Sequence, residues 1–189
     1  VALEQFVLAR YMMFATVYFH HTTRAFERVL GDALRELWTD PWALDAIDEF
    51  LAWDDFRVME SLRPSQSAAA SALRDRLSPF ALAAEFNGEG DLTLYEACER
   101  VLRERFGDDV WGDAQSERMR RGPALYVQVM GAIVEATEAS DLIRRLSGKA
   151  YWRKLFVRRG AGQVDEARRL CAQVRTHRSP AWSALPLPF

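Results

Sequence analysis

The chain has 189 residues, of which 49% are hydrophobic and 28% are charged, and its formal net charge at pH 7 is −2. This composition is typical of one folded domain or two small lobes, and it excludes a disordered or low-complexity chain. No run of about 18 consecutive apolar residues is present and no signal peptide opens the sequence, so we expect a cytoplasmic protein without a membrane span.

The charges are unevenly distributed along the chain. Residues 1–117 hold 11 Lys/Arg and 22 Asp/Glu, whereas residues 118–189 hold 14 Lys/Arg and 5 Asp/Glu. Such an asymmetry is compatible with two arrangements. Either the two parts dock on each other by charge, or the basic part meets phosphate groups.

Residues 2–37 are predicted to be helical. Apolar side chains recur at helical spacing on one face, and a second apolar set falls on the opposite face over the first five turns. The members of the second set are Leu8, Met12, Ala15 and Phe19. A helix that is apolar on two sides is typical of the middle of a larger structure, so we expect another segment or another subunit to cover it.

Further helices are predicted up to residue 86, each from a capping or helix-starting residue. Asp40-Pro41 is predicted to start a helix whose apolar residues between Leu44 and Leu51 face inward, and Asp54 or Asp55 is predicted to cap the next helix. The Ser/Ala-rich run 65–72 leads into a helix around Leu73 to Leu77, and Ser78-Pro79 is predicted to start one more. The glycine-containing segment 87–90 is predicted to be a loop and the boundary between two lobes.

Residues 87–189 have the mixed pattern of a small α+β lobe. Helices are predicted at 92–106, 141–146 and 164–175, and strands at 124–130, 133–136 and 151–157. Cys98 and Cys171 lie on helical patterns and are expected to be buried free thiols, with a disulfide between them as the alternative. The predicted fold is therefore mainly α and α+β overall, with a helical lobe over 1–86 followed by a small α+β lobe over 87–189.

Arg10 lies within the first apolar stripe, and Phe14 and Tyr18 follow it at i+4 and i+8, so the three side chains share one helix face. A buried guanidinium needs a carboxylate or a phosphate as its partner. A guanidinium, an aromatic ring and a phenol on one face fit the phosphate and the base or sugar of a nucleotide. The alternative is an arginine–carboxylate bridge beneath ordinary packing.

The run Leu8 to Arg24, which reads LARYMMFATVYFHHTTR, resembles the helix that follows the HD domain in bacterial HD-superfamily phosphohydrolases similar to the dNTP triphosphohydrolases. The resemblance implies that the parent protein hydrolyses dNTPs or related nucleoside phosphates. It also implies that Arg10 contacts the substrate phosphate and that Tyr18 lies along the deoxyribose. Phe14 stands where the mammalian relative has a histidine.

His20 matches a residue near the allosteric nucleotide site of that family, and His21 stands where the mammalian relative has a lysine. The two histidines are therefore candidates for a second, regulatory nucleotide site. The alternative is a pair of histidines on the helix surface with ordinary hydrogen bonds.

Hydrolysis in this family needs a divalent metal held by an H…HD…D motif, which activates water. The chain has three histidines, His20, His21 and His177, and none precedes an aspartate. The resemblance therefore implies that the metal is bound by an HD segment upstream of Val1 and that this chain holds no catalytic residue and no metal ligand. The expected partners are a nucleotide and either the HD half or further copies of the chain in a homo-oligomer.

Two other functions remain open on the residues alone. Basic stretches at 118–121, 144–145 and 153–159, the last interleaved with aromatic residues, also fit a nucleic-acid-binding lobe. The plainer interpretation of the last stretch is a strand with one packed face and one solvated basic face. The second function is a non-catalytic regulatory module that binds a nucleotide.

Overall fold

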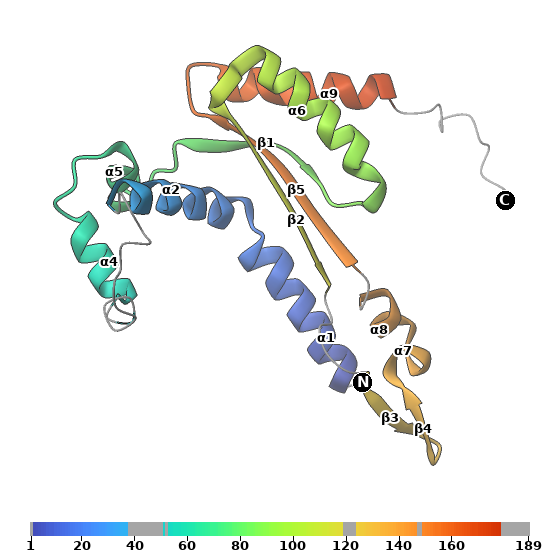
Figure 1. Ribbon diagram of the computed structural model, residues 1–189. Helices are drawn as coiled ribbons and strands as arrows, with labels where there is room; N and C mark the ends of the chain where they lie inside the picture. The colour runs from blue at the N-terminus through green and yellow to red at the C-terminus, as the bar shows by residue number, and fades with distance from the viewer. Residues whose placement is uncertain (1, 38–50, 52, 119–123, 147–148, 179–189) are drawn as a thin grey trace. The chain divides into compact units, whose positions relative to one another are not determined.

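The computed structural model describes residues 2–37, 51, 53–118, 124–146 and 149–178 (Figure 1). Contacts divide the chain into two compact units, of which unit 1 consists of Val1–His20 and Leu82–Phe189 and unit 2 of His21–Ala81. The sequence-based division placed residues 1–86 together. The contacts group the first 20 residues with the later part because they pack against elements that follow residue 135.

A three-stranded sheet forms the centre of unit 1. Its strands lie in the order β1 (Phe80–Phe86), β5 (Lys149–Arg158) and β2 (Val110–Arg118). β5 pairs antiparallel with β2, so that Trp111 lies opposite Phe156 and Asp113 lies opposite Lys154. Since side chains alternate between the two faces of a strand, these four lie on the same face of the sheet.

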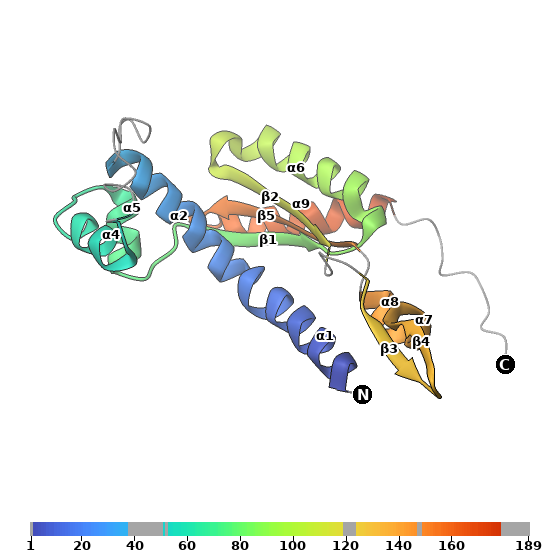
Figure 2. The same ribbon diagram turned by 60° about the horizontal axis from the view of Figure 1, so that its bottom comes forward.

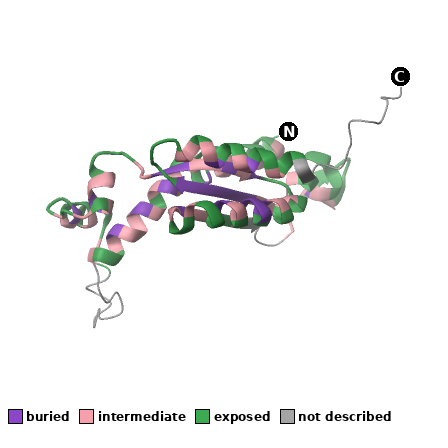
Figure 3. Ribbon diagram, turned by 90° about the horizontal axis from the view of Figure 1, so that it is seen from above, coloured by how far each residue is buried: buried purple, intermediate pink, exposed green. Residues whose placement is uncertain are grey.

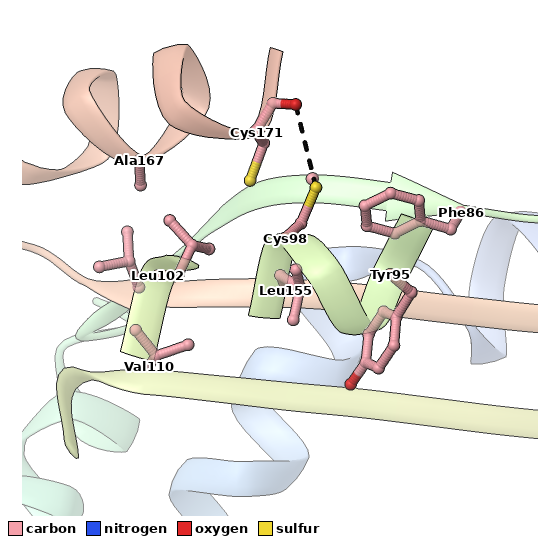
Figure 4. Close-up of a cluster of buried hydrophobic side chains, with 10 residues drawn as sticks. Phe86, Tyr95, Cys98, Leu102, Val110, Leu155, Ala167 and Cys171 are labelled. Atoms are coloured by element: carbon pink, nitrogen blue, oxygen red, sulfur yellow. Dashed lines mark hydrogen bonds between the residues drawn. The ribbon is translucent and has the colours of Figure 1, made fainter. Parts of the chain in front are cut away.

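Two helices, α6 (Leu92–Phe106) and α9 (Gln163–Arg178), pack against each other and cover the opposite face of the sheet (Figures 1 and 2). Ten buried side chains between these helices and the strands form the core of unit 1: Ala84, Phe86, Tyr95, Cys98, Leu102, Val110, Leu155, Val157, Ala167 and Cys171 (Figure 4). Figure 3 shows the buried residues in purple along the strands.

The two cysteines are buried free thiols, as predicted, and they face each other where α6 meets α9 (Figure 4). Cys98 Sγ lies 3.9 Å from the backbone oxygen of Cys171. The hydrogen bond with Cys98, followed by burial, raises the pKa of the Cys171 thiol above its ordinary value. The Cys171 thiol is therefore expected to stay protonated and unreactive while the core is folded.

The close packing of α6 on β2 depends on a glycine. A Cβ added at Gly112 would collide with the Tyr95 hydroxyl and would lie 2.9 Å from Glu99 Oε1. Burial, followed by the nearby Glu99 charge, raises the pKa of Tyr95 above its ordinary value, so the phenol stays neutral.

The strand β5 corrects one interpretation of the basic stretch 153–159. Every residue from Trp152 to Val157 is buried, so neither face of the strand is a solvated basic face. Lys154 Nζ lies 2.7 Å from Glu85 Oε1 in β1, and Arg153 donates a hydrogen bond of 2.8 Å to the carbonyl of Gly88. The prediction failed because the carboxylate and the carbonyl that accept these cations come from segments distant in the sequence.

A two-stranded hairpin and two short helices complete unit 1: β3 (Tyr126–Val129), β4 (Ala132–Glu135), α7 (Ala136–Ala139) and α8 (Asp141–Leu146). Met130 and Gly131 form the turn with φ of 49° and 88°, and this pair of positive values matches the twist of a tight hairpin. The Ser140 hydroxyl accepts a hydrogen bond of 3.3 Å from the Ile143 amide, which confirms Ser140 as the cap of α8.

Unit 2 is helical. Its helices are α2 (His21–Leu37), α4 (Asp55–Leu62) and α5 (Ala68–Arg74), and Ala33, Leu62 and Ala70 form a buried cluster among them. Asp54 caps α4, as predicted, by accepting a hydrogen bond of 2.8 Å from the Arg57 amide. The helix predicted from Asp40-Pro41 over Leu44 to Leu51 lies outside the described residues, apart from Leu51.

The helix predicted to start at Ser78-Pro79 is wrong, because this segment forms the strand β1 (Phe80–Phe86). The run is apolar at nearly every position, and such a run fits a buried strand as well as a buried helix. The fold class itself is confirmed, since a mainly helical first part is followed by an α+β part with a small antiparallel sheet. In the described part of the chain, no helix combines the length and the apolar character needed to cross a membrane.

Candidate functional site

The segment with the candidate residues is a helix whose winding changes. α1 (Ala2–Met13) continues into the π-helix η1 (Phe14–Tyr18), and the Phe19 amide donates a hydrogen bond of 2.8 Å to the Phe14 carbonyl five residues earlier. The Thr16 hydroxyl also donates to the Met12 carbonyl over 2.7 Å. Single π-turns within helices occur frequently at functional sites, because they displace side chains from the regular helical positions.

The structure brings Arg10, Phe14 and Tyr18 together, with the Phe14 ring between the other two. The Arg10 guanidinium lies 4.9 Å from the centre of the Phe14 ring, and the ring centres of Phe14 and Tyr18 are 5.3 Å apart. Arg10 and Tyr18 are exposed and Phe14 is half-buried. The arrangement therefore presents a cation and two rings on one accessible surface of unit 1.

Two aromatic residues that the sequence analysis did not select connect this surface to the sheet. Phe19 stacks on Phe14 with ring centres 5.9 Å apart, and on Trp152 at 4.3 Å with an interplanar angle of 9°. Trp152 is buried on the central strand β5 and also contacts Tyr11 of α1. Phe14 is thus held by a series of stacked rings that ends in the sheet, and such pairs contribute about 0.5–1.5 kcal/mol each beyond area burial.

The rest of α1 presents apolar side chains to solvent. No residue of α1 is buried, and the exposed large apolar side chains of α1 and η1 are Phe6, Leu8, Met12, Met13, Val17 and Tyr18. Exposed apolar side chains in this number on one helix are typical of an interaction site. These exposed side chains agree with the prediction that the helix is apolar on two sides. That another segment or another subunit covers them stays a prediction.

α1 is attached to the rest of unit 1 at a second point. The Ser140 hydroxyl donates a hydrogen bond of 2.6 Å to Glu4 Oε1 while it caps α8. This hydrogen bond lowers the pKa of Glu4 below its ordinary value. Because a lowered pKa favours the ionised carboxylate, the contact is strongest above the ordinary pKa of a glutamic acid and weakens as the pH falls.

The two candidate histidines lie at the end of this segment. His20 is exposed and follows η1, and its amide donates over 3.4 Å to the Val17 carbonyl. His21 is half-buried and opens α2, and it belongs to unit 2 whereas His20 belongs to unit 1. The predicted regulatory nucleotide site at these residues stays a prediction.

Metal ligands gather nowhere in the described ranges: no group of three or more His, Cys, Asp or Glu side chains is close enough to hold an ion.

Several cations of the basic second part are engaged inside unit 1. Lys154 pairs with Glu85, Arg153 donates to the Gly88 carbonyl over 2.8 Å, and Arg158 bridges to Asp109 over 2.9 Å. These contacts agree with docking by charge within the protein. They leave fewer cations for a nucleic-acid backbone than the sequence suggests.

The comparisons with known proteins agree with part of this description. Residues 1–82 match the family model described as an HD associated region, which supports an HD-domain-associated protein. No curated protein matches the sequence. The crystal structure of a hypothetical protein from Aquifex aeolicus superposes with a TM-score of 0.72 and 24% sequence identity over 89% of this chain. The match covers 44% of that protein, so the chain spans less than half of its length, and the likeness shows the fold alone.

Proposed function

We propose that this HD-associated chain is part of a metal-dependent HD phosphohydrolase that hydrolyses dNTPs or related nucleoside phosphates. The alignment of Arg10, Phe14 and Tyr18 on one accessible surface carries the proposal, because this segment lies within the matched region 1–82. A guanidinium binds phosphate oxygens through charge-assisted hydrogen bonds, and aromatic rings pack against a sugar or base.

The three side chains have separate roles in this proposal. Arg10 holds a substrate phosphate, Phe14 supports the guanidinium and packs against the substrate, and Tyr18 lies along the deoxyribose, where it disfavours a 2′-hydroxyl. The rings of Phe19 and Trp152 hold Phe14 in place. His20 and His21 are the candidates for a second nucleotide site.

No catalytic residue is assigned to this chain in the proposal. The divalent metal, which activates water in such enzymes, is proposed to be held by an HD segment outside these 189 residues. The chain then supplies the wall of the substrate site and an interface between copies in a cytoplasmic homo-oligomer. The exposed apolar surface of α1 supports a neighbouring domain at that place.

A non-catalytic module that binds a nucleotide would use the same three side chains, so the site geometry alone does not separate the two functions. A nucleic-acid-binding lobe is less well supported. Arg153 and Lys154, at the centre of the basic stretch that suggested it, are buried in unit 1.

The substitution Arg10→Ala is expected to lower kcat/KM for dNTP hydrolysis about 100-fold, because charged hydrogen bonds to phosphate contribute about 1.5–3 kcal/mol. The measurement is phosphate or triphosphate release with Mg²⁺ or Mn²⁺ by the protein made from its complete gene. Arg144→Ala is the matched control, since Arg144 is an exposed arginine that pairs with Asp141 on its own helix. Its kcat/KM should stay within about twofold of the unsubstituted protein.

The same assay separates the alternatives. Hydrolysis that is equally fast in the Arg10 variant would contradict the assigned role of Arg10. If no nucleotide is hydrolysed with either metal, while dNTP binding still depends on Arg10, the regulatory module is the correct function and the proposed hydrolase is wrong.

A further inference from the structure

The hairpin formed by β3 and β4 carries an apolar surface that the proposed nucleotide site does not use. Its exposed side chains are Leu125, Tyr126, Val129, Met130 and Ile133, with 40%, 66%, 43%, 104% and 76% of their surface accessible. Tyr126 and Ile133, on one face, and Met130 at the turn together expose on the order of 500 Å², within the range of the largest apolar patch on a typical monomer. A patch of this size marks an interaction site.

The hairpin is a defined element and not a loose loop. It has a tight turn at Met130-Gly131, and the Ala136 amide at the start of α7 donates a hydrogen bond of 2.8 Å to the Leu125 carbonyl. α7 packs against both strands. Figures 1 and 2 show the turn pointing away from α7 and α8.

One face of the hairpin is more exposed than the other. The strand register places Tyr126 opposite Glu135 and Gln128 opposite Ile133, so these four side chains share a face. On the other face, Val127 and Val134 are half-buried, and Val129 at the end of the strand is 43% exposed. The surface available to a partner is therefore the face of Tyr126 and Ile133 together with the turn.

The stretch 124–134 contains no charged residue, although 28% of the chain is charged. Glu135, the next charged side chain, is half-buried at the base of the hairpin. A surface that meets its own copy about a twofold axis places each residue near the same residue of the partner, so any charge near the axis would face a like charge. An uncharged stretch removes this repulsion.

We propose that the β3–β4 hairpin binds the same hairpin of a second copy of this chain about a twofold axis, through the face of Tyr126 and Ile133. This inference deepens the oligomer part of the proposed function and gives that interface a location. The two copies bury on the order of 1,000 Å² in total through this face and the turn, which is the size of weak, transient interfaces. We therefore expect a reversible dimer that forms at micromolar concentrations or above.

The test is sedimentation velocity on the protein from its complete gene, between about 1 and 100 µM and without nucleotide. The unsubstituted protein is expected to double its mass across this range. Ile133→Lys should raise the dimer dissociation constant at least 100-fold, because it places two like charges at the axis. Leu77→Lys is the control: Leu77 is 69% exposed and lies in unit 2, and its variant should dimerise as before.

A cysteine variant gives a second measurement of the same interface, which does not depend on the folding of Ile133→Lys. Gln128→Cys, on the same face as Ile133, should form a disulfide-linked dimer on mild oxidation, whereas Glu138→Cys on the exposed surface of α7 should not. Cys98 and Cys171 are buried and do not compete. Ile133→Lys must also keep the circular dichroism spectrum of the unsubstituted protein.

Three results would overturn the proposal. They are a monomer at every concentration, a dimer that Ile133→Lys leaves unchanged, or a hairpin that binds only an HD segment of the same protein. Because mass is measured without nucleotide, none of these results depends on whether the protein hydrolyses dNTPs.

Discussion

The substitution Trp152→Ala is expected to lower the free energy of unfolding by about 4 kcal/mol, the middle of the range for removing a buried tryptophan. Trp152 is 5% exposed, and its ring stacks on Phe19 with 4.3 Å between ring centres. Alanine removes this stack and the contact with Tyr11, and it leaves a cavity between η1 and β5. Urea denaturation followed by circular dichroism measures the change.

Two control substitutions show whether the loss of stability comes from the buried aromatic contacts of Trp152. Trp152→Phe keeps a ring in place and should cost less than half as much. Phe56→Ala removes an aromatic side chain that is 70% exposed, and its effect should stay within about 0.5 kcal/mol. A loss below about 1 kcal/mol for Trp152→Ala would mean that the aromatic cluster does not hold α1 and η1 on the sheet.

Lys154→Met is expected to destabilise the protein by about 2 kcal/mol, since it removes a buried cation that pairs with the half-buried Glu85 and lies opposite the buried Asp113. Lys154 is 2% exposed and binds Glu85 over 2.7 Å, and it lies opposite the buried Asp113 of β2. Methionine keeps most of the volume but removes the cation between two carboxylate-bearing strands. Urea denaturation at pH 7 gives the difference.

An exposed ion pair of the same sheet is the matched control. Arg158 at the end of β5 bridges to Asp109 over 2.9 Å, with 52% and 37% of the two side chains exposed. Arg158→Met should therefore cost less than about 1 kcal/mol. Equal losses in the two variants would contradict the buried charge as the cause of the effect.

Local signals in the sequence predicted several elements well. α6 was expected from Leu92 to Phe106 because Gly107 follows, and Gly107 has a φ of 58° at that end. Asp54 and Ser140 cap the helices that follow them because their side chains accept from amides within the next turn. A capping or helix-ending signal depends only on residues within about one helical turn, so the local sequence is enough to predict it.

The strands β1 and β2 were not predicted, because their identity depends on distant partners. β2 contains Gly112 and the buried Asp113, and its polar residues are typical of a loop when they are considered alone. Its strand conformation comes from pairing with β5, about 40 residues later in the chain. The same reason explains why β5 was predicted to have a solvated basic face.

The candidate site was predicted in part. Helical spacing was enough to place Arg10, Phe14 and Tyr18 on one face, and the structure brings them together. The π-helix was not predicted, since it needs a hydrogen-bond change that composition does not signal. Nor did periodicity point to Trp152 as a support, because its contact with Phe19 joins two ends of the chain.

Unit 1 is built from two separated stretches of chain, and this order matters while the protein is being synthesised. The rings of η1 leave the ribosome about 130 residues before Trp152, which at roughly 10 residues per second is a delay of more than ten seconds. During that time unit 2, which is continuous, can already fold. α1 and η1 must wait for Trp152 before the sheet can cover their aromatic side chains, so we expect this part of the nascent chain to be most prone to misfolding before β5 is made.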